Sequence, residues 1–185
     1  YHTFQEHIKS LDNWETELFV DLKMHRRETV LIDLMVAATP CEVEAALVSP
    51  GTKFKLVGVS DGSVMRHSTF GWVCCLADAE EEIVSCAGPV FGAKPSSFRA
   101  EGYGMLSLAR FLYRLFDYCN RLEELETLFG CDNKGLLQRI LALTNQSFAN
   151  PSTTMAPDWD VVQATVKTFH LLPVMPTMPR RQRRH

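Results

Sequence analysis

The feature that most constrains the fold is a change of hydrophobic period along the chain. Residues 53–63, 69–78 and 82–90 are rich in apolar and β-branched side chains and are separated by short polar segments, which predicts three β-strands. Because the connections are short, we expect these strands to pair antiparallel as a meander. From residue 96 the apolar residues recur every three or four positions instead, which predicts a helix.

Two local signals place the ends of these first elements. The first strand runs into Ser60, Asp61, Gly62 and Ser63, a combination typical of a turn. The helix follows Pro95, and Ser96 or Ser97 is its expected N-cap. Glu101 lies on the apolar face of this helix, in its first turn. A carboxylate on a buried face is unfavourable unless something compensates it.

The remainder of the chain predicts one more strand and two more helices. Residues 125–132 form the expected strand, which ends in Asp132, and residues 133–143 and 158–172 have helical spacing. We interpret Asp158 and Asp160 as N-caps of the last helix. A right-handed crossover through the first helix would bring the fourth strand parallel to the first and beside it.

This topology places three carboxylates together. Asp61 and Asp132 follow the ends of neighbouring parallel strands, and Glu101 starts the helix that packs over them. Carboxylates in close contact repel one another unless a cation neutralises them or a proton is shared. Oxygen ligands of this kind favour Mg²⁺ or Mn²⁺, and two such ions promote phosphoryl displacement. The pattern therefore predicts a metal-dependent nuclease.

The same segments carry a family resemblance. "SDGS" at 60–63, "FRAEGYGMLSLARFL" at 98–112 and "LFGCDNKGLL" at 128–137 resemble the three carboxylate motifs of type 1 ribonuclease H. "SSFRAEGYGMLS" is similar to the ribonuclease H domains that follow reverse transcriptases in retrotransposon polyproteins. The resemblance covers roughly residues 53–172. It implies a ribonuclease H-like α/β fold, in which helices pack on a mixed sheet made of an antiparallel three-strand meander and one parallel strand.

The resemblance also implies a role for each residue. Asp61 would be shared by two Mg²⁺ or Mn²⁺ ions, Glu101 would bind the ion on the leaving-group side, and Asp132 would bind the ion that activates water. Ser63 and Asn133 would contact backbone phosphate or ribose. The implied substrate is the RNA strand of an RNA–DNA hybrid, and the implied partner is a reverse transcriptase domain upstream in the same polyprotein.

The sequence departs from the family pattern at its C-terminal end. The family continues with a fifth strand, a Gly-His motif and a fourth aspartate, whereas residues 173–185 read "PVMPTMPRRQRRH". We therefore expect the fifth strand to be missing or truncated. A catalytically impaired structural or nucleic-acid-binding module is the main alternative function. Another nuclease of the same superfold, such as an integrase or a DNA exonuclease, is a third, and cleavage of a DNA-only duplex would distinguish it.

Composition limits the domain organisation and the setting. The 185 residues suit one α/β domain at 53–172, preceded by a helical connector from an upstream domain at 1–52 and followed by a disordered basic tail at 173–185. The net charge of −3 argues against tight autonomous binding to nucleic acid. None of the six cysteines forms a CxxC pair, so we expect reduced cysteines and an intracellular protein. No apolar run reaches the roughly 18 residues of a membrane span.

Overall fold

The computed structural model describes residues 54–76, 82–90, 96–118, 125–145 and 157–172. Within these ranges the elements follow in the order β1 (Phe54–Val64), β2 (Ser68–Leu76), β3 (Glu82–Pro89), α5 (Ser97–Tyr118), β4 (Leu125–Gly130), α6 (Lys134–Thr144) and α8 (Trp159–Leu171). The predicted connector at 1–52, the basic tail at 173–185 and any fifth strand within that tail lie outside the described residues.

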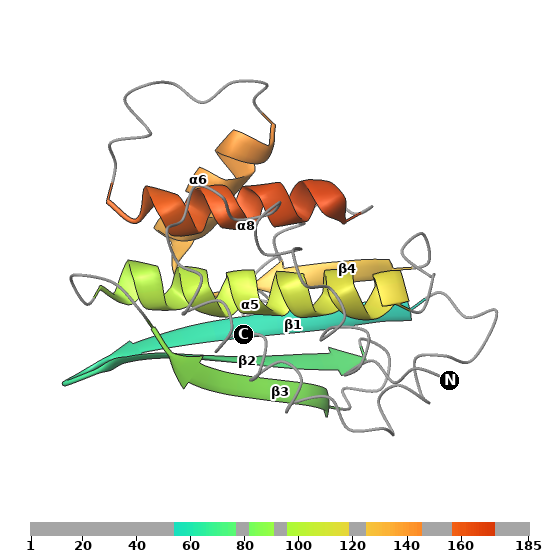
Figure 1. Cartoon of the computed structure of the whole chain (residues 1–185), viewed down its shortest axis with the longest axis horizontal. Coiled ribbons are helices and arrows are strands. Elements are labelled where there is room, and N and C mark those ends of the chain that lie inside the picture. The colour runs from blue at the N-terminus through green and yellow to red at the C-terminus, as the bar shows by residue number, and fades with distance from the viewer. Residues whose placement is uncertain (1–53, 77–81, 91–95, 119–124, 146–156, 173–185) are drawn as a thin grey trace, which may run out of the picture.

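The four described strands form one mixed sheet in the order β3-β2-β1-β4. Strand β1 is antiparallel to β2 and parallel to β4, and β2 is antiparallel to β3. The three described helices all lie on one side of this sheet, with α5 directly on it and α8 and α6 beyond α5 (Figure 1). The predicted mixed sheet with a crossover helix is confirmed.

The turn predicted at residues 60–63 is wrong. These residues belong to β1, where Asp61 pairs with Gly71 and Ser63 pairs with Thr69, and the hairpin turns at residues 65–67 instead. The reason is the helix above: Gly62 lies so close to α5 that a Cβ atom on it would be 2.4 Å from the backbone nitrogen of Glu101. The glycine is required by helix packing within a strand, not by a turn.

Helix α5 packs closely on β1 because both elements have glycines at the contact. A Cβ atom on Gly58 would be 2.4 Å from Cδ2 of Leu108, and one on Gly104 would be 2.9 Å from Cβ of Ser60. Buried aromatic side chains fill the remaining space, and Trp72 donates its indole N–H to Ser107 Oγ at 2.9 Å. This close approach sets the height of α5, and therefore of Glu101, above the sheet.

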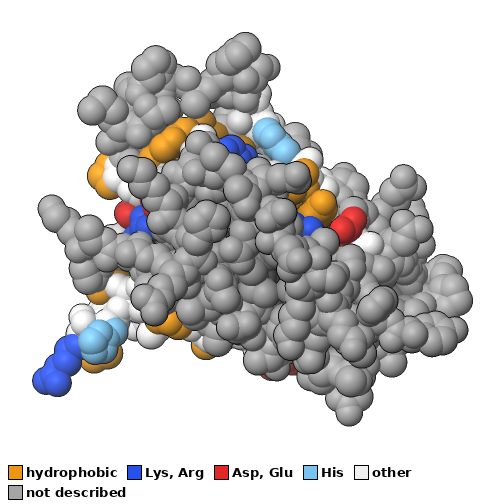
Figure 2. All heavy atoms as spheres, in the orientation of Figure 1, with side chains coloured by type: hydrophobic (Ala, Val, Ile, Leu, Met, Phe, Trp, Pro, Cys, Tyr) orange, Lys and Arg blue, Asp and Glu red, His pale blue; other side chains and the backbone are white. Residues whose placement is uncertain are grey.

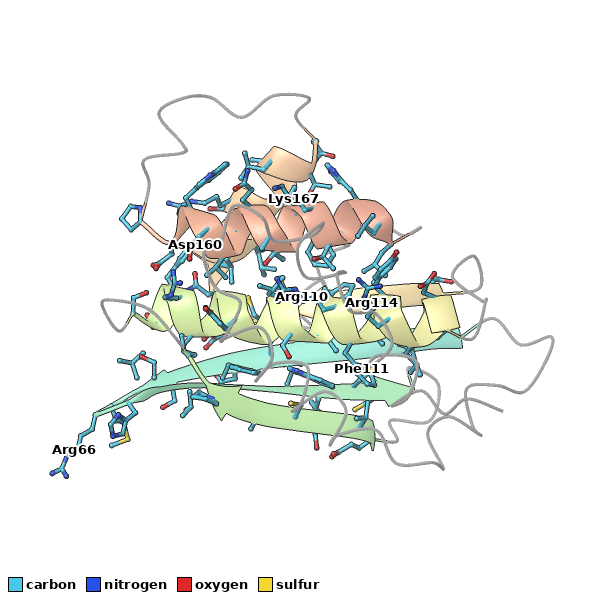
Figure 3. The ribbon with its side chains drawn as sticks, in the orientation of Figure 1. Arg66, Arg110, Phe111, Arg114, Asp160 and Lys167 are labelled. Carbon is cyan, nitrogen blue, oxygen red and sulfur yellow. The ribbon has the colours of Figure 1, made fainter. Side chains whose placement is uncertain are left out.

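Helix α8 packs on the side of α5 that faces away from the sheet (Figure 1). Figure 3 shows Phe111 directed to the sheet side of α5 and Arg110 and Arg114 directed to the side where α8 lies. Helix α8 also reaches the sheet, since the Phe169 ring contacts that of Phe129 on β4 at 4.8 Å between centroids. None of the helices in the described ranges is long and apolar enough to cross a membrane.

Candidate metal centre

The three carboxylates predicted to converge do so. Asp61 lies in β1, Glu101 in α5, and Asp132 two residues beyond the end of β4, and one oxygen from each lies within 4.8 Å of the others. Glu101 was expected in the first turn of its helix. Because α5 begins at Ser97, Glu101 is instead in the second turn, too far inside for a helix-start acid.

The parallel pairing of β1 and β4 explains why Asp61 and Asp132 meet. The last paired residues are Val59 and Gly130, so both chains run past this point in the same direction. Asp61 and Asp132 each follow two residues later. Strand β4 ends at Gly130, so its pairing with β1 stops before Asp61. Glu101 approaches Asp61 there from α5. The backbone N–H of Gly62 donates to Asp61 Oδ1 at 2.8 Å, which holds that carboxylate in place.

Glu101 is the buried member of the cluster. Its side chain is on the sheet side of α5 and the residue is only 4% exposed, whereas Asp61 and Asp132 are exposed. Burial raises the pKa of the Glu101 carboxyl to about 8, and a hydrogen bond with Asp132 and the charges of Asp132 and Asp61 act in the same direction, against the backbone N–H of Gly62. The raised pKa indicates that this buried carboxyl takes up a proton readily when no cation neutralises the cluster.

The donor set fits a hard divalent cation. Glu101 Oε2 is buried and has no hydrogen-bond partner, although carboxylate oxygens in such places normally have one. Oxygen atoms from three carboxylates are the ligands that Mg²⁺ and Mn²⁺ prefer. No further acidic, histidine or cysteine side chain joins this group within the described ranges. The geometry thus supplies three protein ligands for a metal centre.

An ion-pair clamp at the N-terminus of α5 positions Glu101, and sequence reasoning missed it. The Arg99 guanidinium binds Asp160 through two hydrogen bonds of 2.8 and 2.6 Å and Asp158 through one of 3.2 Å. Ser96 Oγ accepts from the backbone N–H of Arg99 and donates to Asp158, both at 2.9 Å. The clamp joins the first turns of α5 and α8, and Arg99 is two residues before Glu101. Figure 3 shows Asp160 at the start of α8.

The clamp corrects the interpretation of Asp158 and Asp160 as N-caps. Asp158 occupies the N-cap position, but its side chain makes no capping hydrogen bond and its φ is 60°. Asp160 is in the first turn, and although burial raises its pKa, the hydrogen bonds and charge of Arg99 hold that pKa below its usual value. One signal was available: an arginine in a first helical turn opposes the helix dipole and needs a partner.

Ser63 and Asn133 have different surroundings. Ser63 is exposed on the same strand as Asp61 and lines a hollow beside it. Asn133 is the N-cap of α6, and its Oδ1 accepts from the backbone N–H of Leu136 at 3.0 Å. The side-chain oxygen of Asn133 is therefore used in the fold, and its amide N–H groups are what remains for a substrate. This position also rules out Asp132 as the cap of α6.

Comparisons with known proteins give one structural similarity. No protein-family model matches the chain, and no curated protein sequence matches it. Among solved structures, the N-terminal RNase H domain of Rv2228c from Mycobacterium tuberculosis, solved as a fusion with maltose-binding protein, is 14% identical with a TM-score of 0.47, over 70% of this chain and 85% of that one. The topology of the described residues is itself the mixed ribonuclease H-like α/β arrangement that the sequence predicted.

Proposed function

We propose that this domain is a metal-dependent endonuclease of the ribonuclease H type, which hydrolyses the RNA strand of RNA–DNA hybrids. The observation that carries the proposal is the cluster of Asp61, Glu101 and Asp132, which brings together two exposed carboxylates and a buried one that has an oxygen without a hydrogen-bond partner. A cluster that repels itself destabilises the fold, so its presence favours a role that needs the charge. A reverse transcriptase domain upstream in a retroelement polyprotein remains part of this proposal.

The residues of the chain divide the work of such a reaction. Asp61, Glu101 and Asp132 would hold the ions, and bound divalent ions supply an activated water and stabilise the leaving oxygen. Asp61 is fixed by the N–H of Gly62, and Glu101 by the helix that Gly62 contacts. Ser63 offers a hydroxyl and Asn133 an amide to the sugar–phosphate backbone. A contact with the 2′-hydroxyl would distinguish RNA from DNA.

The test is cleavage of a hybrid labelled on each strand in turn, with Mg²⁺ and with Mn²⁺. We expect the RNA strand to be cut, the DNA strand to stay intact, and Asp61→Asn to abolish the reaction. Glu126→Gln is the matched control, because Glu126 is an exposed carboxylate on β4 outside the cluster. A DNA-only duplex cut as fast as the hybrid would contradict the substrate that we propose.

One observation favours a second function, a hybrid-binding module without hydrolysis. Within the described residues the cluster has three carboxylates, and the two carboxylates at the start of α8, Asp158 and Asp160, are bound to Arg99. Under this alternative the protein binds the hybrid but leaves both strands intact with either metal. Binding that is unchanged by Asp132→Asn would support it.

A further inference from the structure

A hollow lies beside the carboxylates on the face of the sheet that carries none of the described helices. It has a volume of about 510 Å³, and Asp61, Ser63, Thr69, Gly71 and Ala87 line it together with Phe70 and Gly88. Pairing places Asp61 next to Gly71, and Gly71 next to Ala87, in one row across three strands. The next row along β1 and β2 consists of Ser63 and Thr69.

Gly71 is the residue that keeps this hollow open. A Cβ atom there would meet a single atom of the described residues within 4 Å, the carbonyl oxygen of Cys86 at 3.8 Å, so packing within this part of the chain does not require a glycine. Gly58 and Gly62 differ, because a Cβ on either would collide with α5. Glycine weakens a strand, and one without a packing reason commonly marks the close approach of a ligand. The space that Gly71 leaves is therefore available to an occupant of the hollow.

The chemistry of the lining indicates what that occupant is. Ser63 and Thr69 present two exposed hydroxyls side by side across β1 and β2, and neighbouring strands place opposed side chains on the same face. Serine and threonine hydroxyls are common contacts of nucleic-acid sugar–phosphate backbones. The hydroxyl row is two residues from Asp61, or roughly 7 Å along the strand. The hydroxyls of Ser63 and Thr69 therefore lie in the row of side chains next to Asp61, a member of the carboxylate cluster.

Charge also favours a phosphate backbone. The hairpin turn that follows this row consists of Met65, Arg66 and His67, which are all exposed. Figure 3 shows Arg66 at the far end of β1 and β2, and Figure 2 shows basic and histidine side chains projecting there from the rest of the surface. A strand whose scissile phosphate is at Asp61 would cross the hydroxyl row and approach this cation. A neutral ligand would have no electrostatic attraction to Arg66.

We infer that the hollow at Gly71 binds the sugar–phosphate unit adjacent to the scissile phosphodiester on the cleaved strand, with Thr69 and Ser63 as its hydrogen-bonding residues. This inference rests on the proposed function and extends it. Thr69 and Gly71 become substrate-binding positions beside the three carboxylates. Gly71 contributes by leaving space, which a larger side chain would fill.

Gly71→Val tests the hollow directly. Valine suits a strand, and the space at this position accepts its Cβ, so the variant should fold. We expect KM for the hybrid to rise about tenfold or more, while the increase in Tm caused by Mn²⁺ stays as in the unaltered protein. Thr69→Val, which removes one hydroxyl at constant size, should raise KM roughly fivefold. Ser85→Val is the control, since Ser85 is exposed on β3 and does not line the hollow.

A second measurement identifies the occupant. Hybrids that carry one uncharged methylphosphonate, at each position within three nucleotides of the cut, should include one that slows the unaltered protein but has no further effect on Gly71→Val. If KM is unchanged in Gly71→Val, or if no position shows this loss of effect, the inference is overturned while the nuclease proposal stands.

If the unaltered protein cuts no hybrid, the nuclease proposal fails on its own. Binding of a fluorescent hybrid then tests the hollow, in the Asp132→Asn background with and without Gly71→Val. Weaker binding in the double variant would support the inference, and equal binding would overturn it.

Discussion

Replacing Glu101 with glutamine should make the metal-free protein more stable at neutral pH. Glutamine keeps the size of the side chain, and its amide N–H can donate to Asp132 as the protonated carboxyl does. It cannot ionise. The variant therefore resembles the protonated form of Glu101 at every pH, and it cannot add a third negative charge to the cluster.

The magnitude follows from proton linkage. The carboxyl has a pKa of about 8 in the folded protein, against an ordinary value of 4.5, so the folded state binds this proton more tightly than the unfolded chain does. Stability contributed by the proton is fully present below pH 4.5 and is lost as the pH rises through about 8. At ~1.4 kcal/mol per pH unit, the loss reaches at most about 3 kcal/mol at pH 7.

The assay is thermal unfolding in EDTA between pH 5 and pH 8.5. We expect the Tm of Glu101→Gln to differ least from that of the unaltered protein at pH 5, and to exceed it increasingly above that. At neutral pH the gain is up to roughly 6 to 12 °C, since 1 kcal/mol corresponds to about 2–4 °C in a domain of this size. Mn²⁺ should raise the Tm of the unaltered protein by occupying the cluster, and that of the variant much less. Glu126→Gln should change neither curve.

Two results would refute the reasoning. One is a Glu101→Gln variant that is less stable than the unaltered protein at pH 7 in EDTA, which would mean that the charged cluster stabilises the fold. The other is a difference in Tm that does not vary with pH, which would mean that the Glu101 proton is not linked to folding.

Three further predictions follow from the same geometry. Arg99→Met should lower the free energy of unfolding by about 3 kcal/mol in urea titrations, because it leaves Asp158 and Asp160 without their cation, whereas Arg66→Met at the exposed hairpin should be neutral. Gly62→Ala should cost about 1–3 kcal/mol and reduce the Mn²⁺-induced rise in Tm, since the new methyl displaces α5; equal metal response would show that Glu101 had not moved. Asp160 has a depressed pKa, so its contribution to stability is complete above about pH 3.8 and is lost as the pH falls further; acid unfolding followed by circular dichroism should begin at higher pH in Asp160→Asn, and an unchanged midpoint would contradict this.

The carboxylate site could be predicted because each member lies near a feature that local pattern marks, although the structure places Asp61 inside β1 and Glu101 in the second turn of α5. Asp61 and Asp132 follow apolar runs, and Glu101 follows a helix start. Right-handed crossover then leaves little freedom in how the runs pair. The four described strands, the parallel position of β4 and the convergence of the three side chains all follow from that rule.

The sequence by itself therefore determined the order of elements, the mixed sheet and the identity of the three clustered carboxylates, because period and chain connectivity are local properties. Only the tertiary structure decided the rest. It showed that Gly62 belongs to a strand under α5, that Arg99 binds Asp158 and Asp160, and that Gly71 keeps a hollow open. These features depend on distances between residues far apart in the chain. Such distances arise only when the helices pack on the sheet. Local pattern shows at most that a partner is needed, as Arg99 in a first helical turn does, and it does not identify that partner.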